Sequence, residues 1–336
     1  MKPRTFSAMA AACLTAIWPA GCENQPGSTG GAPPATQPAA VKVEVPKKDK
    51  YIVGFSQCTI QEPWRVQMNK DVAEAAARHP NLELRVAVAD DKIDKQVNDV
   101  ENFVTQGVDF LIISPKETAR SLTDAVARAY QKKIPVIVLD RRVLGDQYTC
   151  FIGADNYKIG LEAGKYAREL LGGKGHIVEL KGNMTSTPGE LRHNGFVAAI
   201  KDELASGAIR IVHDADVDWK EGKAKSEMES ALAANAQIDL VYGHNDPAAH
   251  GAWMAAKDAN RESKIKFIGI DALPHEGIAY VKEGVLSASL QYPTGGDKAI
   301  EVIQDMIAGR EVPRTITLGT RLFTRETVAS GGKAID

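Results

Sequence analysis

The chain has 336 residues, a formal net charge of -2 at pH 7 and 44% hydrophobic residues. This length and composition fit a globular protein with room for two domains. A charge so close to neutral provides no electrostatic basis for nucleic-acid binding, so it does not favour that class of function.

The N-terminal segment predicts export. Lys2 and Arg4 precede the apolar run "FSAMAAACLTAIWPA", which is too short to span a bilayer well and is typical of a secretory signal. The run ends in "PAGC", which resembles a bacterial lipoprotein processing site, although Pro19 stands where that pattern prefers Leu. We therefore expect residues 1–22 to be a lipoprotein signal and anchor with Cys22 lipidated; simple secretion with cleavage nearby is the alternative.

Residues 23–50 are rich in Pro, Gly, Ala and polar residues. Such a composition cannot bury a core, so it predicts a flexible tether between the anchor and the folded region. After this point the only cysteines are Cys58 and Cys150, beside the first and fifth predicted strands. We do not expect those strands to be neighbours, so free or buried thiols are favoured over a disulfide. No CxxC or Cys/His cluster predicts a metal site, and we expect no cofactor.

The first half of the folded region alternates short β-branched runs with helical patterns. The predicted strands are 51–57, 83–90, 109–114, 135–140 and 148–155, and the helices between them include 64–79, 92–106 and 117–132. Continuous apolar strands separated by helices are typical of a parallel sheet covered by helices on both faces.

The same pattern then begins again. The further predicted strands are 175–182, 209–216, 239–246, 266–273 and 285–293, with helices at 157–171, 189–205, 221–235, 247–260 and near 295–308. No linker-like stretch separates the two halves. We therefore predict an α/β protein with two doubly wound parallel-sheet lobes that lie close together and are joined by a hinge.

Polar or charged residues follow almost every predicted strand. In doubly wound sheets the ligand lies beyond the carboxyl ends of the strands. These positions are Gln57, Asp90, Ser114, Asp140 and Arg141 in the first half, and Asn183, Asp214, Asp216, Asn245, Asp246, Asp271 and Gln291 in the second. Together they predict two polar rims that face each other across a cleft.

The residue types at these rims suit a neutral polyhydroxyl ligand. Carboxylates accept from hydroxyls, guanidiniums donate to them, amides do both, and aromatic rings pack on the C–H face of a sugar. Trp64, Arg65, Arg192 and Trp219 extend the set of candidates. Each candidate also has a structural alternative: a core position for the tryptophans, a surface ion pair for Asp140, a solvated helix charge for Arg192 and a helix cap for Asn245.

Several short motifs carry a family resemblance: "GFSQ…EPWR", "FVTQGVDFLIISP", "IPVIVLDR", "RHNGF", "DWKEGKA", "YGHND" and "IGID". Over roughly residues 50–325 the chain resembles the bacterial periplasmic sugar-binding proteins of the ribose-binding type, the soluble receptors of ABC importers. The resemblance implies the type I periplasmic binding protein fold. We place the N-terminal lobe at 51–154 and 292–318, and the C-terminal lobe at 155–291 and 319–330.

The resemblance also implies which residues contact the sugar. The polar contacts map to Asp140, Arg141, Arg192, Asn245, Asp271 and Gln291, and the aromatic positions map to Trp64 and Trp219. The chain departs from the ribose binders after the first strand, where they carry paired phenylalanines and this chain reads "EPWRVQM". That form is closer to the galactofuranose-binding branch. It adds Glu62 and Arg65 as contacts and favours a furanose, or a ligand with more hydroxyls, over plain ribose.

The leading hypothesis is binding without catalysis. We expect an exported monomer, in the periplasm or at the extracytoplasmic face of a membrane, that captures a pentose or hexose by hinge closure and delivers it to an ABC permease. The alternative in the same fold is a sugar-sensing receptor that presents its closed lobes to a chemoreceptor or a histidine kinase.

An enzyme that acts on glycosides is a third hypothesis. Strand-end carboxylates and several histidines offer acid and base groups; these are His176, His193, His213, His244 and His275. However, the sequence has no G-x-S-x-G elbow, Walker loop or zinc-ligand spacing. A repressor is also disfavoured, because no helix-turn-helix precedes the fold.

Overall fold

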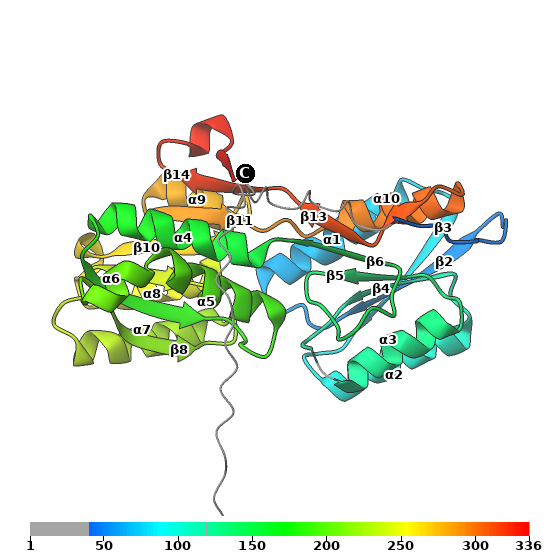
Figure 1. The fold of residues 1–336 in the computed structure, drawn as a ribbon, viewed down its shortest axis with the longest axis horizontal. Helices are drawn as coiled ribbons and strands as arrows, with labels where there is room; N and C mark the ends of the chain where they lie inside the picture. Colours follow the sequence, from blue (N-terminus) through cyan, green and yellow to red (C-terminus); the bar gives the residue numbers. More distant parts are fainter. Residues whose placement is uncertain (1–39, 119, 336) are drawn as a thin grey trace, which may run out of the picture. The chain divides into compact units, whose positions relative to one another are not determined.

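The computed structural model of the chain describes residues 40–118 and 120–335. The predicted signal, Cys22 and residues 23–39 of the predicted tether lie outside the described residues. Within the described part, strands and helices alternate along the chain as the sequence periodicity predicts, and they build two α/β lobes, each around its own sheet (Figure 1).

The first lobe contains a six-stranded sheet in which every pairing is parallel. In sheet order its strands are β13 (Thr315–Leu318), β6 (Cys150–Ala154), β5 (Val136–Leu139), β4 (Phe110–Ser114), β2 (Tyr51–Gln57) and β3 (Leu82–Val88). Its helices are α1 (Pro63–Ala77), α2 (Ile93–Gln106), α3 (Arg120–Gln131) and α10 (Gly296–Ile307). Since β2 and β6 are not neighbours, Cys58 and Cys150 remain separate; both are buried free thiols, as the sequence predicts.

Strand β4 shows why the apolar runs are continuous. Successive side chains of a strand point to opposite faces of the sheet. Phe110 and Ile112 pack in one core cluster with residues of α1 and α10, whereas Leu111 and Ile113 pack in another with residues of α2 and α3. Helices therefore cover both faces, so neither face of this strand tolerates polar residues.

The second lobe contains a seven-stranded sheet. In sheet order its strands are β15 (Lys333–Ile335), β14 (Thr320–Thr324), β11 (Ala288–Gln291), β10 (Lys266–Asp271), β9 (Leu240–Gly243), β7 (Gly175–Lys181) and β8 (Ile209–Asp216). Its helices are α4 (Asn156–Leu171), α5 (Thr187–Ala199), α6 (Lys201–Ser206), α7 (Glu221–Ala234), α8 (Asp246–Asp258) and α9 (Gly277–Glu283). The strands from β8 to β11 are parallel, and β14 and β15 add an antiparallel edge that the sequence analysis does not predict.

Within the described residues, the chain passes from one sheet to the other at three places. These crossing segments lie between β6 and α4, between β11 and α10, and between β13 and β14. They lie close to the positions at which the sequence analysis divides the lobes. The second sheet, however, continues to β15, beyond the predicted limit of residue 330.

Residues 40–45, which the sequence analysis assigns to the tether, belong to the folded part of the chain. Strand β1 (Ala40–Val41) pairs antiparallel with β12 (Val312–Pro313), and Val43 and Val45 pack against the main hydrophobic core. The segment "VKVEV" alternates apolar and charged residues, which is the pattern of a half-buried strand. The Pro- and Gly-rich composition of the surrounding sequence obscures this short signal.

Candidate functional site

A cavity lies between the two lobes, beside the carboxyl ends of their parallel strands. The cavity is small: the space open to the centres of water-sized molecules is about 30 Å³. The lining residues are Glu62, Trp64, Arg65, Asp140, Arg141, Pro188, Arg192, Trp219, Asn245, Asp271 and Tyr292. The structure thus brings together nine of the ten residues that the sequence analysis selects as ligand contacts. The exception is Gln291, which does not line the cavity.

The Asp140 carboxylate organises the first-lobe side of the cavity. Its Oδ2 accepts a hydrogen bond from Arg65 Nη2 at 2.6 Å, and its Oδ1 accepts one from the Tyr292 hydroxyl at 2.9 Å. Arg65 also donates to Ser114 Oγ, and Arg141 Nε lies 3.6 Å from Asp140 Oδ2. The carboxylate therefore fixes two arginines and one tyrosine at the cavity wall, with lone pairs left for a ligand.

A backbone turn places Asp140 and Arg141 in the same cavity. Side-chain alternation in a strand would send consecutive residues to opposite faces. Asp140 instead has a φ of 66°, in the left-handed region that Asp tolerates better than most residues. Arg142 does not line the cavity, and its guanidinium lies 3.7 Å from the ring centroid of Phe151.

Two crossing segments connect the lobes through hydrogen bonds at the cavity. Tyr292 lies in the segment after β11, and Asn156 lies directly after the segment that follows β6. Asn156 Nδ2 donates to the Tyr292 hydroxyl at 3.3 Å, and Asn156 Oδ1 accepts from Arg192 Nε at 2.9 Å. A continuous chain of polar contacts therefore runs from Asp140 in the first lobe to Arg192 in the second.

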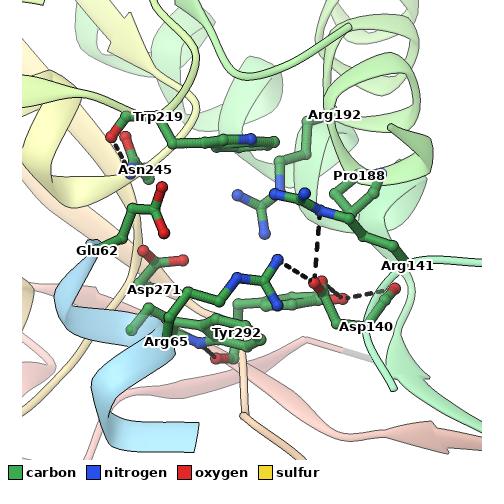
Figure 2. A pocket seen from close by; sticks show the side chains of 11 residues that line it. Glu62, Arg65, Asp140, Arg141, Pro188, Arg192, Trp219, Asn245, Asp271 and Tyr292 are labelled. Carbon is green, nitrogen blue, oxygen red and sulfur yellow. Dashed lines mark hydrogen bonds and ion pairs between the residues drawn. The ribbon is translucent and has the colours of Figure 1, made fainter. Parts of the chain in front are cut away.

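Aromatic rings form two opposite walls of the cavity (Figure 2). The Trp219 ring lies so close to Gly182 that a Cβ there would come within 2.2 Å of the indole, so this approach requires glycine. On the other wall the rings of Tyr292 and Trp64 lie 5.2 Å apart, and Trp64 Nε1 donates to the Tyr292 carbonyl at 2.7 Å. The Arg192 guanidinium lies 4.7 Å from the Tyr292 ring and 5.4 Å from the Trp219 ring.

Several buried polar atoms of the lining have no hydrogen-bond partner among the described residues. Arg141 Nε and Trp219 Nε1 are donors without an acceptor, and Glu62 Oε2 is an acceptor without a donor. An unpaired buried polar group costs about 1–3 kcal/mol. Because donors and acceptors are both unsatisfied, the cavity suits a ligand whose groups both donate and accept, as hydroxyls do.

Asn245 both caps a helix and lines the cavity, so the two alternatives given for it in the sequence analysis are compatible. It caps α8, since its Oδ1 accepts from the Ala248 N–H at 3.1 Å. Its Nδ2 donates to the Trp219 carbonyl at 3.0 Å and fixes the loop that carries this indole. One amide hydrogen of Asn245 remains available to a ligand.

Asp271 is held in the cavity by a neighbouring buried carboxylate. Asp246 Oδ2 accepts from the Ala272 N–H at 2.7 Å, and Asp246 Oδ1 accepts from Ser289 Oγ at 2.6 Å. These bonds hold a strained turn in which Asp271 has a φ of 126°. Burial raises the pKa of the Asp271 carboxyl well above its usual range, although the nearby Arg192 opposes this shift.

Sequence reasoning missed Tyr292 and Pro188. Gln291, the last residue of β11, is the residue predicted from the sequence, whereas the next residue, Tyr292, lines the cavity, because consecutive residues of an extended chain point to opposite sides. The alternation of "SLQYP" was a usable signal. Pro188 gives no signal of this kind, since a proline in the first turn of a helix is explained by helix initiation alone.

The histidines considered for an enzyme do not line the cavity. Within the part of the chain that the structure describes, no group of three or more His, Cys, Asp and Glu side chains is placed to hold a metal ion. Among residues 40–118 and 120–335, no helix combines the length and apolar character required to cross a membrane.

Comparison with known proteins identifies the family. The periplasmic binding protein domain matches residues 53–311. The ribose import binding protein of Bacillus subtilis is 28% identical over 281 residues, which cover 83% of this chain and 89% of that protein. The galactofuranose-binding protein of Escherichia coli is 30% identical over 276 residues, which cover 79% and 85%.

A solved structure shows a similar fold at higher identity. The fructose-binding periplasmic domain of a hybrid two-component system has a TM-score of 0.79 and 41% identity, and the match covers 83% of this chain and 92% of that domain. The chain belongs to the periplasmic sugar-binding protein family of the ribose-binding type, with the two-lobed type I fold. These relatives are binding proteins by name, and none is named as an enzyme.

Proposed function

We propose that this protein captures one monosaccharide in the cavity between its lobes and acts as a solute-binding protein outside the cytoplasm. One observation carries the proposal: a small cavity between two aromatic walls has unpaired donors and acceptors at its surface. A sugar ring has two C–H faces for the aromatic walls and a rim of hydroxyls for the polar atoms. Figure 2 shows this arrangement, with Trp219 and Tyr292 on opposite sides of the polar groups.

Closure of the lobes would complete the site. Contacts between the lobes already include the Thr185 hydroxyl, which donates to Glu117 Oε2 at 2.8 Å, and the Arg142 N–H, which donates to Thr187 Oγ1 at 3.3 Å. In the proposed mechanism the sugar docks on one lobe, and closure then desolvates it against the other. The ligand stabilises the closed form only through contacts that both lobes make at once.

The ligand class is a pentose or hexose, with a furanose ring favoured. The relatives support this range, since their names specify ribose, galactofuranose and fructose. Glu62 and Arg65, which follow the first strand, both line the cavity and add one acceptor and one donor. A ligand richer in hydroxyls than ribose can use both of them.

We propose delivery to an ABC importer as the role of the closed form, by analogy with the ribose import relative. The second candidate is a sugar sensor, because the fructose-binding periplasmic domain of a hybrid two-component system is 41% identical to this chain. The proposal includes a monomeric protein and a lipid anchor at Cys22, which would hold the protein close to either membrane partner.

A thermal-shift screen tests the binding proposal. Monosaccharides and polyols are added singly to the purified protein, and a bound sugar raises the melting temperature by mass action. We expect D-fructose, D-ribose or a galactofuranose-like sugar to give the largest shift. The absence of any shift across the panel, or turnover of an aryl glycoside, would reject the proposal.

A gene deletion separates import from sensing. Uptake of the radiolabelled sugar and transcription of sugar-responsive genes are measured in the same strain. Loss of uptake supports the importer role. Intact uptake with loss of the transcriptional response supports the sensor.

A further inference from the structure

A buried ion cluster lies behind the second-lobe side of the cavity. Glu179 of β7 is fully excluded from solvent. Its Oε1 and Oε2 lie 2.9 and 3.0 Å from His193 Nδ1, and Oε1 lies 3.0 Å from His244 Nε2. His244 is itself fully buried, whereas the His193 side chain is 32% exposed and connects the cluster to solvent.

Both histidines are covalently adjacent to residues of the cavity. His193 follows Arg192 in α5, and His244 precedes Asn245 at the end of β9. The His244 carbonyl also accepts a hydrogen bond from Arg192 Nη1. Glu179 therefore connects α5, which carries Arg192, to the end of β9, which precedes Asn245.

The position of this cluster within the lobe is tightly restricted. Helix α5 packs so closely on α4 that a Cβ added at Gly160 of α4 would come within 2.2 Å of the Arg192 carbonyl oxygen of α5. On β9, the Tyr242 ring stacks on Phe196 at 4.1 Å and lies 5.0 Å from the His244 ring. Since α5 and β9 are closely packed at these points, a change in the cluster is transmitted to both elements.

The charges of the cluster are unequal. Burial would raise the pKa of Glu179, but hydrogen bonds from His193 and His244 outweigh it and lower that pKa to about 2. The hydrogen bond to Glu179 raises the pKa of His193, and burial lowers the pKa of His244. The protonated partner of the buried carboxylate is therefore the solvent-connected histidine.

The other charged or titratable groups near the cluster come from each element packed against it. They are Lys181 on β7, Asp214 on β8, Tyr242 on β9 and Arg192 on α5. When His193 loses its proton, Glu179 loses a close cationic partner that has access to solvent, and the field acting on Arg192 changes.

We propose that Glu179 is a positioning residue for the sugar site: its carboxylate, held between His193 and His244, fixes Arg192 and Asn245 in their ligand-facing positions, and His193 makes sugar affinity respond to pH. This inference rests on the proposed function. It gives a role to two histidines that do not line the cavity. It also predicts that sugar affinity is highest when His193 is protonated.

The test uses titration calorimetry with the sugar that the thermal-shift screen selects, from about pH 5.5 to about pH 8.5, the range in which histidines titrate. The first variant, Glu179→Gln, keeps the side-chain shape and removes the charge. The second variant, His193→Gln, keeps a donor for Glu179 and removes the titration. The control, His213→Gln, removes a histidine that lies 3.1 Å from Glu227 in the same lobe and does not line the cavity.

We expect the wild type and His213→Gln to lose affinity as pH rises. Asp246 and Glu276, whose pKa values burial raises to about 8 and about 7, titrate in the same range, so the decisive quantity is the difference from the control. His193→Gln should lack the component of the pH dependence due to His193. Glu179→Gln should weaken binding about threefold to thirtyfold, the range of coupling through intermediate residues.

The outcomes separate a failure of the positioning role from a failure of the proposed function. An unchanged pH profile in His193→Gln, or unchanged affinity in a folded Glu179→Gln protein, rejects the positioning role. If Glu179→Gln does not fold, the His193→Gln profile alone decides. Failure of the wild type to bind any sugar rejects the proposed function instead, so the two failures are distinguishable.

Discussion

Arg65 and Asp140 are 75 positions apart in the sequence, yet Arg65 Nη2 and Asp140 Oδ2 lie 2.6 Å apart in an ion pair whose side chains are 4% and 3% exposed. One residue begins the first helix of the first lobe, and the other ends its fourth predicted strand. A buried ion pair is weak evidence for stability, because desolvation offsets most of the Coulomb attraction. Its position at the cavity wall indicates a role in binding.

Substitution of Asp140 tests that role. Asp140→Asn keeps the volume but removes the charge that organises Arg65, Arg141 and the Tyr292 hydroxyl. We expect sugar affinity to fall roughly tenfold to a hundredfold, since a hydrogen bond to a charged group contributes about 1.5–3 kcal/mol. Calorimetry measures the affinity.

The matched control for Asp140 is Glu101→Gln, which breaks an arginine–carboxylate pair in the same lobe that is 40–48% exposed. Exposed pairs contribute little, so this control should bind sugar as the wild type does. Full sugar affinity in Asp140→Asn, together with a large loss of stability, would assign the pair a structural role.

Trp219 should report the ligand by its fluorescence. The indole lines the cavity with an unpaired Nε1, so a bound sugar changes both its polarity and its hydrogen bonding. We expect Trp219→Phe to lose most of the sugar-induced emission change. Trp253→Phe removes an indole that packs on His250 away from the cavity, and it should keep the change. An undiminished signal in Trp219→Phe would exclude Trp219 as the reporter.

The close contact between α4 and α5 makes Gly160 sensitive to substitution. In Gly160→Ala the new Cβ would lie 2.2 Å from the Arg192 carbonyl oxygen, so α5 must shift. Overpacking of this kind costs about 1–3 kcal/mol. We expect a lower free energy of unfolding and a weaker sugar affinity, measured by urea denaturation and calorimetry.

Gly222→Ala is the matched control for Gly160→Ala, because it also adds a methyl group at a glycine within a helix. It lies in α7, and a Cβ there would meet no atom within 4 Å. Gly222→Ala should leave the affinity unchanged and stabilise the protein by roughly 0.5–1 kcal/mol through helix propensity. Equal effects of the two alanines would contradict the role assigned to the contact at Gly160.

The stability of the sugar-free protein should fall as pH rises from the ordinary Asp range to about 8. Burial raises the pKa of Asp246 to about 8, so the native state holds this proton to a higher pH than the unfolded chain does. Between the ordinary Asp pKa and about 8 the native state binds more protons, and the free energy of unfolding therefore decreases with pH. Urea denaturation at about pH 5, 7 and 9 measures the slope.

Asp246→Asn should flatten this slope, since asparagine does not titrate. The exposed Asp258→Asn, at the other end of the same helix, should keep it. A slope in Asp246→Asn as steep as that of the wild type would show that other groups cause the pH dependence.

Much of the fold could be predicted from the sequence, because parallel strands buried on both faces leave long apolar runs such as "FLIIS" in β4. The antiparallel edge strand β14 reads "TRLFT", which mixes polar and apolar residues and does not stand out from a loop. Strand β1 has only two residues and is defined by its partner β12, which lies about 270 positions further along the chain.

The cavity lining could be predicted for the same topological reason: side chains at the carboxyl ends of parallel strands meet at one edge. Local backbone geometry at strand ends is harder to predict. The positive φ of Asp140 brings two consecutive residues into the cavity, and the extended chain after β11 brings in Tyr292 and not Gln291. The cluster of Glu179, His193 and His244 depends on packing between three elements, which no local pattern reveals.

Titration calorimetry of the wild type and the double variant Asp140→Asn/Asp271→Asn, with the sugar selected by the thermal-shift screen, tests whether the cavity is the sugar site. Both carboxylates line the one cavity, from different lobes. We expect one sugar per wild-type molecule and no measurable binding to a folded double variant. Sugar binding of unchanged affinity and stoichiometry in that variant would contradict the account.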